Sequence, residues 1–152
     1  MKRNVKSSIS LFIFTLSLTN KAIVKFSFKK PEEVKKKILI VEDEPMSIMV
    51  IKKILAPYQF QLVIAVNGLD AVEKFEKQKA DLVIMDLYLP EMDGFEASKR
   101  IKSISIDTPI IVISTTDIPE DELKKDIGID YLLKKPLNIK KFQDFIHMLL
   151  LA

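Results

Sequence analysis

The sequence of 152 residues contains no cysteine, one histidine and only three glycines. Without cysteine it can form no disulfide and no thiolate metal site, and it has no thiol nucleophile. The single histidine, His147, excludes a metal centre built from several histidines. A composition of 48% hydrophobic and 30% charged residues excludes collagen-like and disordered chains. The chemistry of this chain must therefore depend on carboxylates, hydroxyls and lysines.

Basic residues are concentrated at the start of the chain. Residues 1–36 hold nine Lys or Arg against two Glu, a net charge of +7. Residues 37–152 hold fifteen Lys or Arg against nineteen Asp or Glu, a net charge of −4. The net charge of this part is mildly acidic and does not suggest a nucleic-acid surface, so we expect no nucleic-acid partner.

Residues 1–36 form an N-terminal extension ahead of the predicted fold. Met1–Lys6 is basic, and Ile9–Leu18 is an apolar run that would rise only about 15 Å as a helix, half of a hydrocarbon core. This order is typical of a secretory signal, but no small-x-small cleavage site follows the run. Three interpretations stay open: a flexible or membrane-touching extension, a start codon assigned too early, and an export signal.

From Lys37 onward, short apolar runs alternate with stretches of helical periodicity. The runs are continuous and mostly β-branched, as in parallel strands covered by helices on both faces. They are Ile38–Val41, Leu62–Ala65, Leu82–Met85, Ile110–Ile113 and Tyr131–Leu133. The helical stretches are Met46–Leu55, Leu69–Lys79, Phe95–Ile104, one from near Pro119 to a cap at Gly128, and Ile139–Leu150. This alternation predicts a doubly wound α/β domain over residues 37–152.

The first helical stretch also suggests which side chains face the core. Met49, Val50 and Ile54 share one stripe of the helix, and we expect this stripe to be buried. We expect Met46 to fill space in the core as well.

Side chains that carry chemistry follow four of the five predicted strands. They are Glu42, Asp43 and Glu44 after the first strand, Asp86 after the third, Ser114 after the fourth, and Lys134 and Lys135 after the fifth. Each of these alone is most simply a solvated loop residue. Together they would meet at the carboxyl edge of the sheet, where α/β proteins bind ligands. Clustered carboxylates repel each other unless a hard cation such as Mg²⁺ binds them, so the pattern predicts a metal-assisted phosphoryl site.

Residues 37–146 resemble the receiver domain of two-component response regulators. The similar stretches are KILIVEDEP at 37–45, DLVIMDLYLPEMDGFEASKRIK at 81–102, TPIIVIST at 108–115 and GIDYLLKKPL at 128–137. The resemblance implies a flavodoxin-like fold: a five-stranded parallel sheet in the order 2-1-3-4-5 with five flanking helices.

The resemblance also implies roles for the residues at the strand ends. Asp86 corresponds to the phosphoacceptor. Glu42 and Asp43 correspond to the acidic pair that binds Mg²⁺ together with Asp86 and the backbone carbonyl of Tyr88.

Two further residues correspond to the groups that contact the phosphoryl oxygens. Ser114 matches the hydroxyl after the fourth strand, and Lys135 matches the lysine that pairs with phosphate. The Lys135–Pro136 peptide bond is expected to be cis.

The function that the resemblance implies is phosphorelay signal transduction. Asp86 would take a phosphoryl group from the phosphohistidine of a sensor histidine kinase or a histidine phosphotransfer protein. The face formed by the fourth helix, the fifth strand and the fifth helix would then change conformation. We expect autodephosphorylation but no dedicated enzyme activity, and a cytoplasmic location, although the run at 9–18 leaves membrane association or export open. Few residues follow Ile146, so we expect no DNA-binding domain and an unknown protein as the downstream target.

Among the departures from the family pattern, two bear most directly on the site. Leu132 stands where the family has its switch aromatic, and Tyr131, one residue earlier, should face the opposite side of the sheet. Tyr88 places a ring two residues after Asp86, where it would shield an acyl phosphate from water.

Rival functions fit the sequence less well. An Asp-nucleophile phosphohydrolase needs a D-x-D motif, but Tyr88 stands at the second acidic position. No glycine-rich nucleotide loop is present. The alternative that stays open is a receiver-like adaptor that acts without phosphorylation. The intact set of Asp86, Glu42, Asp43, Ser114 and Lys135 argues against it, whereas Leu132 leaves room for it.

Overall fold

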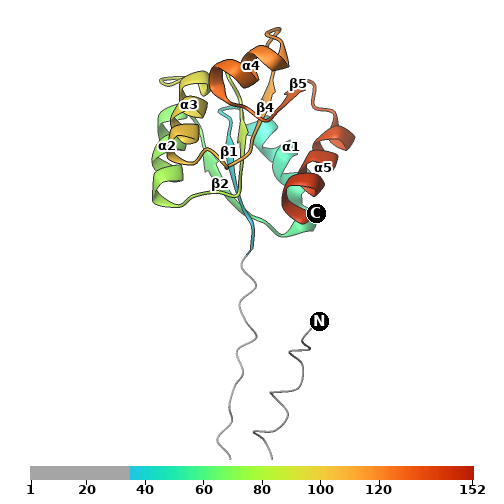
Figure 1. Cartoon of the computed structure of the whole chain (residues 1–152). Coiled ribbons are helices and arrows are strands. Elements are labelled where there is room, and N and C mark those ends of the chain that lie inside the picture. The colour runs from blue at the N-terminus through green and yellow to red at the C-terminus, as the bar shows by residue number, and fades with distance from the viewer. Residues whose placement is uncertain (1–34) are drawn as a thin grey trace, which may run out of the picture. The chain divides into compact units, whose positions relative to one another are not determined.

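The structure is a computed structural model that describes residues 35–152, and the three interpretations of the N-terminal extension lie outside this range except at Lys35 and Lys36. Strands and helices alternate along the described chain, as Figure 1 shows. The strands are β1 (Lys37–Val41), β2 (Gln61–Ala65), β3 (Leu82–Met85), β4 (Ile110–Ser114) and β5 (Tyr131–Lys134). The helices are α1 (Pro45–Leu55), α2 (Gly68–Lys77), α3 (Gly94–Ile104), α4 (Glu120–Ile127) and α5 (Ile139–Ile146).

All neighbouring strands pair in parallel, in the order β2-β1-β3-β4-β5. The predicted fold class and strand order are therefore confirmed. Because the strands are parallel, all five carboxyl ends lie at one edge of the sheet, and the helices begin there. The loops at that edge carry the candidate site.

Each face of the sheet packs against its own group of helices. Side chains such as Leu39, Val83 and Val112 form one core with α2, α3 and α4. Their sequence neighbours, such as Ile40 and Ile84, form a second core with α1 and α5. The strands are buried on both faces, which explains why their sequences are continuously apolar.

The prediction for the buried stripe of α1 was wrong for Met49 and Val50, whereas Ile54 is half-buried and packs against the core. Ile51 and Leu55 face the core, whereas Met49 and Val50 are 58% and 44% exposed and Met46 is 61% exposed. Apolar residues occur all around this helix, so periodicity alone could not identify the buried face. Met46 and Val50 lie beside the candidate site.

The ends of the helices differ only slightly from the prediction. Gly128 caps α4 in the left-handed conformation, with φ of 72°, as its position predicted. The last helix is α-helical only to Ile146, and a π-helical turn follows over His147–Leu151. The Lys135–Pro136 bond is cis, as the resemblance implied. No helix within residues 35–152 combines the length and the apolar character needed to cross a membrane.

Candidate functional site

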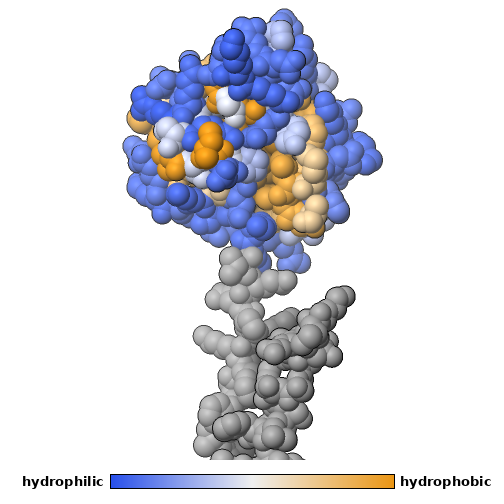
Figure 2. Space-filling view, viewed as in Figure 1, coloured by the Kyte–Doolittle hydropathy of each residue, from blue (hydrophilic) through white to orange (hydrophobic). Residues whose placement is uncertain are grey.

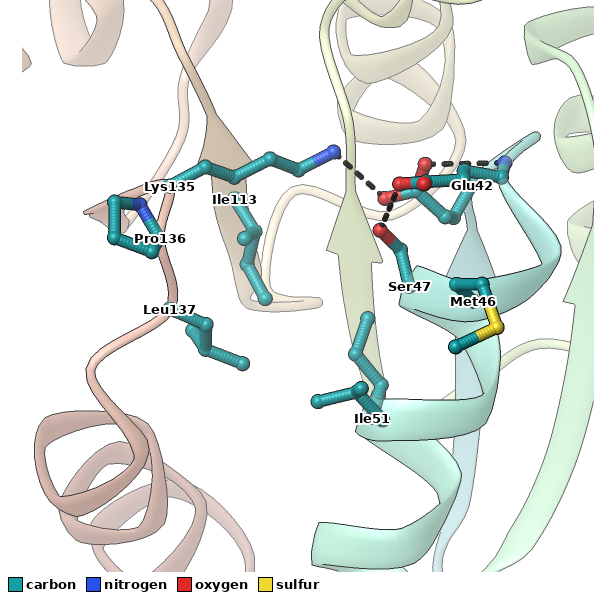
Figure 3. Close-up of a pocket in the computed structure, with 10 residues that line it drawn as sticks. Glu42, Met46, Ser47, Ile51, Ile113, Lys135, Pro136 and Leu137 are labelled. Carbon is teal, nitrogen blue, oxygen red and sulfur yellow. Dashed lines mark hydrogen bonds and ion pairs between the residues drawn. The ribbon is translucent and has the colours of Figure 1, made fainter.

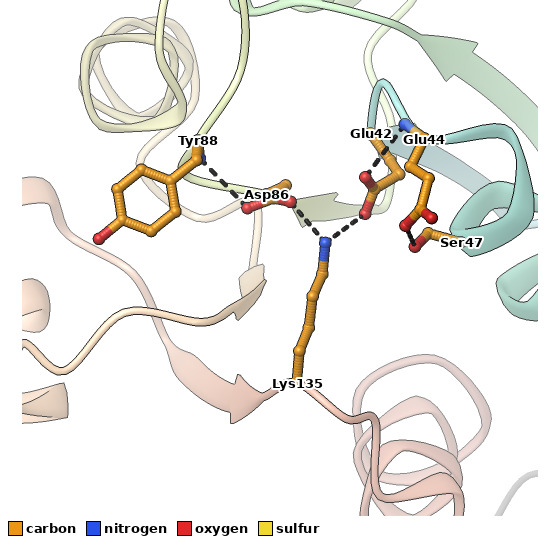
Figure 4. Close-up of polar contacts among 6 residues, drawn as sticks. All are labelled: Glu42, Glu44, Ser47, Asp86, Tyr88 and Lys135. Atoms are coloured by element: carbon orange, nitrogen blue, oxygen red, sulfur yellow. Dashed lines mark hydrogen bonds and ion pairs between the residues drawn. The ribbon is translucent and has the colours of Figure 1, made fainter.

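Three of the predicted site residues meet at the carboxyl edge of the sheet (Figure 4). Glu42 directly follows β1, Asp86 directly follows β3, and Lys135 directly follows β5. The central position of β1 and β3 in the sheet places the two carboxylates side by side, and Lys135 extends toward them from the far strand.

Lys135 forms ion pairs with both carboxylates. Its Nζ lies 2.6 Å from Asp86 Oδ2 and 2.9 Å from Glu42 Oε2. Glu42 is 2% exposed and Asp86 is 7% exposed, so both carboxylates are largely removed from water. A buried carboxylate is costly unless it is paired, and here one ammonium group is shared between two of them. The site therefore keeps an excess of negative charge.

Burial and pairing shift the pKa of two members of this group. Burial raises the pKa of Glu42, and the hydrogen bond from Lys135 only partly offsets this effect. Burial lowers the pKa of Lys135, but the hydrogen bonds to Asp86 and Glu42 outweigh it, so the net shift is upward. Lys135 is therefore a permanent cation at neutral pH.

Backbone contacts fix the position of the Asp86 carboxylate. The Tyr88 backbone N–H donates to Asp86 Oδ1 at 3.1 Å, and the Asp86 N–H donates to the Val41 carbonyl at 2.9 Å. Gly94, at the start of α3, allows the chain to fold back closely, because a Cβ there would lie 2.0 Å from the Asp86 carbonyl oxygen. Any other residue at this position would displace the loop that holds Asp86.

The second oxygen of Glu42 accepts a backbone hydrogen bond. The Glu44 N–H donates to Glu42 Oε1 at 3.2 Å, and the Ser47 hydroxyl donates to Glu44 Oε2 at 2.5 Å. Ser47 thus holds Glu44 at the start of α1. The sequence analysis did not predict this Ser47–Glu44 hydrogen bond. The only feature of the sequence that indicates it is an acidic residue three positions before a serine at the start of a helix.

The predicted metal ligands are only partly assembled. Glu42 and Asp86 lie together on Lys135, whereas Asp43 is exposed. Within residues 35–152, no three acidic or histidine side chains are close enough together to hold a metal ion. Mg²⁺ is commonly bound through one or two carboxylates, with water and phosphate oxygens completing its shell. The two buried carboxylates supply suitable hard oxygen donors, so this donor set fits Mg²⁺.

Ser114 lies at the end of β4, and its side chain is fully buried. Its carbonyl oxygen accepts a hydrogen bond from the Lys135 N–H at 3.0 Å, which ties Ser114 to the lysine. Its hydroxyl oxygen has no hydrogen-bond partner within the described part of the chain. A buried hydroxyl without a partner costs about 1–3 kcal/mol. Ser114 therefore has an unused donor next to the lysine of the site.

Thr116, two residues later, is a second buried hydroxyl that sequence reasoning did not assign. Its Oγ1 accepts a hydrogen bond from the Ile118 N–H at 3.1 Å, which shapes the loop before α4. A threonine two residues before an apolar loop residue is too common a pattern to identify such a contact from sequence.

An apolar pocket of about 250 Å³ opens beside the ion pairs (Figure 3). Glu42 and Lys135 line its polar side. Its apolar wall comes from α1 and from the segment after β5, and includes Met46, Val50 and Leu137. The exposed side chains of α1 thus form part of the surroundings of the site.

The side chains of β5 point as the sequence predicted. Leu132 is buried in the core beneath α2, α3 and α4. Tyr131 lies on the opposite face, where its ring centre is 4.4 Å from that of Phe145 in α5. Lys124 of α4 lies 5.8 Å from the centre of the Tyr131 ring. Tyr131 therefore contacts side chains from both α4 and α5.

Tyr88 is 56% exposed, and its ring packs edge-on against Phe95 at a centroid distance of 6.4 Å. In Figure 4 the ring extends away from Lys135. Its effect on the lifetime of a phosphorylated Asp86 stays a prediction.

Comparisons with known proteins agree with this geometry. The family model for the response regulator receiver domain matches residues 38–147. Chemotaxis protein CheY of Bacillus subtilis is 47% identical over 79 residues, which are 51% of this chain and 66% of that protein. Transcriptional regulatory protein ZraR of Klebsiella oxytoca is 34% identical over 109 residues, which are 70% of this chain but only 24% of that protein. The chain thus spans about a quarter of ZraR.

A solved structure with the same fold is the receiver domain of the sensor histidine kinase PA1611 of Pseudomonas aeruginosa. Its TM-score is 0.67 at 28% identity, and the match covers 76% of this chain and 97% of that chain. That structure is described with a magnesium ion coordinated in its active-site cleft.

Proposed function

Since the chain belongs to the response regulator receiver family of two-component phosphorelay signalling, we propose that Asp86 is the residue that accepts the phosphoryl group. The observation that carries this proposal is the pairing of buried Asp86 and Glu42 with the single cation of Lys135. This arrangement provides a fixed carboxylate nucleophile and a cation beside it.

The reaction follows from these groups. An Asp86 carboxylate oxygen attacks the phosphorus of a phosphohistidine, the new oxygen–phosphorus bond forms, and the phosphorus–nitrogen bond breaks. The imidazole leaves with the electron pair and takes a proton from solvent. Such transfers need positioning and charge neutralisation more than covalent assistance from the protein.

Lys135 would move from pairing with two carboxylates to pairing with a phosphoryl oxygen. Its pKa is raised, so it stays positively charged throughout the neutral range. The Ser114 hydroxyl, which lacks a hydrogen-bond partner in the described chain, would donate to a second phosphoryl oxygen.

Mg²⁺ is the proposed cofactor, with Glu42, Asp43, Asp86 and the Tyr88 carbonyl as its protein ligands. Bound there, the ion would offset the negative charge of the carboxylates and of the phosphoryl oxygens. The magnesium ion described for the PA1611 receiver domain supports this assignment. Asp43 is exposed, so its side chain is free to turn toward the ion.

We propose a sensor histidine kinase or a histidine phosphotransfer protein as the donor. Exposed Met46 and Val50 line the pocket beside the site and offer an apolar surface for that protein to contact. The signal would leave through α4, β5 and α5, where Tyr131 contacts both helices while Leu132 stays buried. We further propose that the protein acts in the cytoplasm, hydrolyses its own acyl phosphate slowly, and has no other catalytic activity.

The test is phosphorylation of the full chain by radiolabelled acetyl phosphate in the presence and absence of Mg²⁺. We expect a hydroxylamine-labile label on the wild type that requires Mg²⁺ and is absent from Asp86→Asn. Asp117→Asn is the matched control, because Asp117 is a fully exposed acid after β4 at the same edge of the sheet. A label that persists in Asp86→Asn contradicts the assigned residue, and no label on any form favours the adaptor alternative.

A further inference from the structure

The two ends of the domain carry opposite charge. Because every helix begins at the carboxyl edge of the sheet, all helices end at the opposite, amino edge. Acidic residues occupy the first turn of α2, α3 and α4, whereas lysines occupy the last turn of α1, α2, α3 and α4. The amino edge is therefore the basic end of the domain.

The basic end carries more cations than its own acids neutralise. Lys52 and Lys53 at the end of α1 and Lys79 after α2 have no ion-pair partner within residues 35–152. Lys36 is paired with Asp81, an acid that precedes β3. Asp107, before β4, is exposed. A lysine in the last turn of a helix interacts favourably with the helix dipole. This effect does not explain a second lysine at the end of α1 or the presence of Lys79.

Apolar side chains are exposed at the same end. Met148 and Leu151, in the π-helical turn after α5, are 48% and 43% exposed. Figure 2 shows an apolar area on the side of the domain where α5 lies, and it reaches the part where Figure 1 marks the C-terminal end. The stacked rings of Tyr58 and Phe60, with centres 5.5 Å apart, follow α1 at this end and are half-buried against the core. Lysines, exposed aliphatic side chains and aromatic rings together are typical of a surface that contacts lipid.

We propose that the basic end of the domain binds an anionic lipid surface. The cations would lie at the headgroups and the aliphatic side chains of Met148 and Leu151 would enter the interface. A nucleic acid would use the lysines but not the exposed aliphatic side chains.

This orientation has a consequence for the candidate site. Glu42, Asp86 and Lys135 lie at the opposite edge of the sheet and would face away from the lipid. The domain could thus bind a membrane and still receive a protein partner at its site. The lipid contact does not depend on phosphorylation of Asp86.

The test is co-sedimentation of the full chain with vesicles of phosphatidylglycerol and phosphatidylcholine, compared with vesicles of phosphatidylcholine alone. We expect binding to the anionic vesicles only, and we expect it to weaken at high salt. The double variant Lys52→Gln/Lys53→Gln should bind at least about tenfold more weakly, because each lysine near an anionic surface contributes several-fold in affinity.

The matched control is Lys140→Gln/Lys141→Gln, an exposed pair that removes the same charge from the first turn of α5, at the opposite end. This control should bind within about twofold of the wild type. A second variant, Met148→Ser/Leu151→Ser, changes no charge and should also weaken binding. Thermal melts of all variants establish that each is folded.

Equal binding by all variants would mean that residues 1–34 alone contact the lipid, and it would overturn the proposal. An equal loss of vesicle binding in Lys52→Gln/Lys53→Gln and in Lys140→Gln/Lys141→Gln would show that binding depends only on the net charge of the protein. That result would also overturn the proposal. Binding to a DNA duplex but to neither kind of vesicle would overturn it as well.

Discussion

Two lysines form ion pairs with aspartates at opposite edges of the same sheet, and they differ in the balance of charge. At the amino edge, Lys102 Nζ lies 2.9 Å from Asp130 Oδ2, and the same oxygen accepts a hydrogen bond from the Ile110 N–H at 2.8 Å. At the carboxyl edge, Lys135 is shared by Asp86 and Glu42. One cation matches one anion in the first group, and one cation faces two anions in the second.

We interpret the matched pair as structural and the unmatched Lys135 group as the proposed functional site. The Lys102–Asp130 pair joins α3 to the start of β4 and β5, and its charge is fully matched. Lys102 also donates to the Ile106 carbonyl at 3.1 Å, so its contacts are all internal. The Lys135 group keeps one unmatched negative charge in a buried place, which costs stability and favours the binding of a further cation. Natural sites often retain such costs because they are needed for function.

The largest expected effect comes from the same substitution at both lysines. Lys135→Met should slow phosphorylation by acetyl phosphate on the order of 10²-fold, the usual cost of removing one charge-stabilising donor. Lys102→Met should leave the rate of the folded protein unchanged and lower the free energy of unfolding by only about 1 kcal/mol, because its pair is partly exposed. Initial rates of phosphorylation, with urea unfolding in parallel, measure both. A rate loss in Lys102→Met of similar size would remove the distinction between the two groups.

A smaller effect, of opposite sign at the two edges, is expected from replacing an acid by its amide. In buffer that contains a chelator, Glu42→Gln should raise the free energy of unfolding by about 1 kcal/mol, because it removes the unmatched charge. Asp130→Asn should lower it by about 1 kcal/mol, because Lys102 loses its partner. Urea titrations of the two variants and the wild type give the sign directly.

The effect of Glu42→Gln should depend on pH in a defined direction. The pKa of Glu42 in the folded protein is raised above its ordinary value of 4.5. The stability that the protonated group contributes is therefore fully present below pH 4.5 and is lost as pH rises through the folded-state pKa. The advantage of the Gln variant should therefore be absent below pH 4.5, grow as the pH rises, and be complete above the folded-state pKa. An advantage that is constant with pH would contradict the assigned cause.

Much of this comparison could be predicted from the sequence, because strand order and direction determine where strand ends meet. The residues after β1, β3 and β5 had to converge at one edge once the strands were parallel, and Glu42, Asp86 and Lys135 do so. The sequence could not predict that Lys135 would be shared between two carboxylates and leave one negative charge unmatched. This arrangement depends on the length of the Lys135 side chain and on the burial of Glu42, which no local pattern contains.

Other features escaped prediction for equally physical reasons. The buried face of α1 depends on how the helix is rotated against the sheet, so Ile51 and Leu55 are buried while Met46 and Met49 are exposed. The hydroxyl of Ser114 was predicted as a site group, but its lack of a hydrogen-bond partner within residues 35–152 appears only when the surrounding chain is in place.

The measurement that tests the central claim most directly is calorimetric titration of Mg²⁺ into the wild type, Glu42→Gln and Asp130→Asn. The account predicts one site on the wild type and on Asp130→Asn, and a loss of at least tenfold in affinity on Glu42→Gln, because a carboxylate ligand is removed. Unchanged Mg²⁺ affinity in Glu42→Gln, or an equal loss in Asp130→Asn, would contradict the claim that the unmatched charge beside Lys135 forms the metal site.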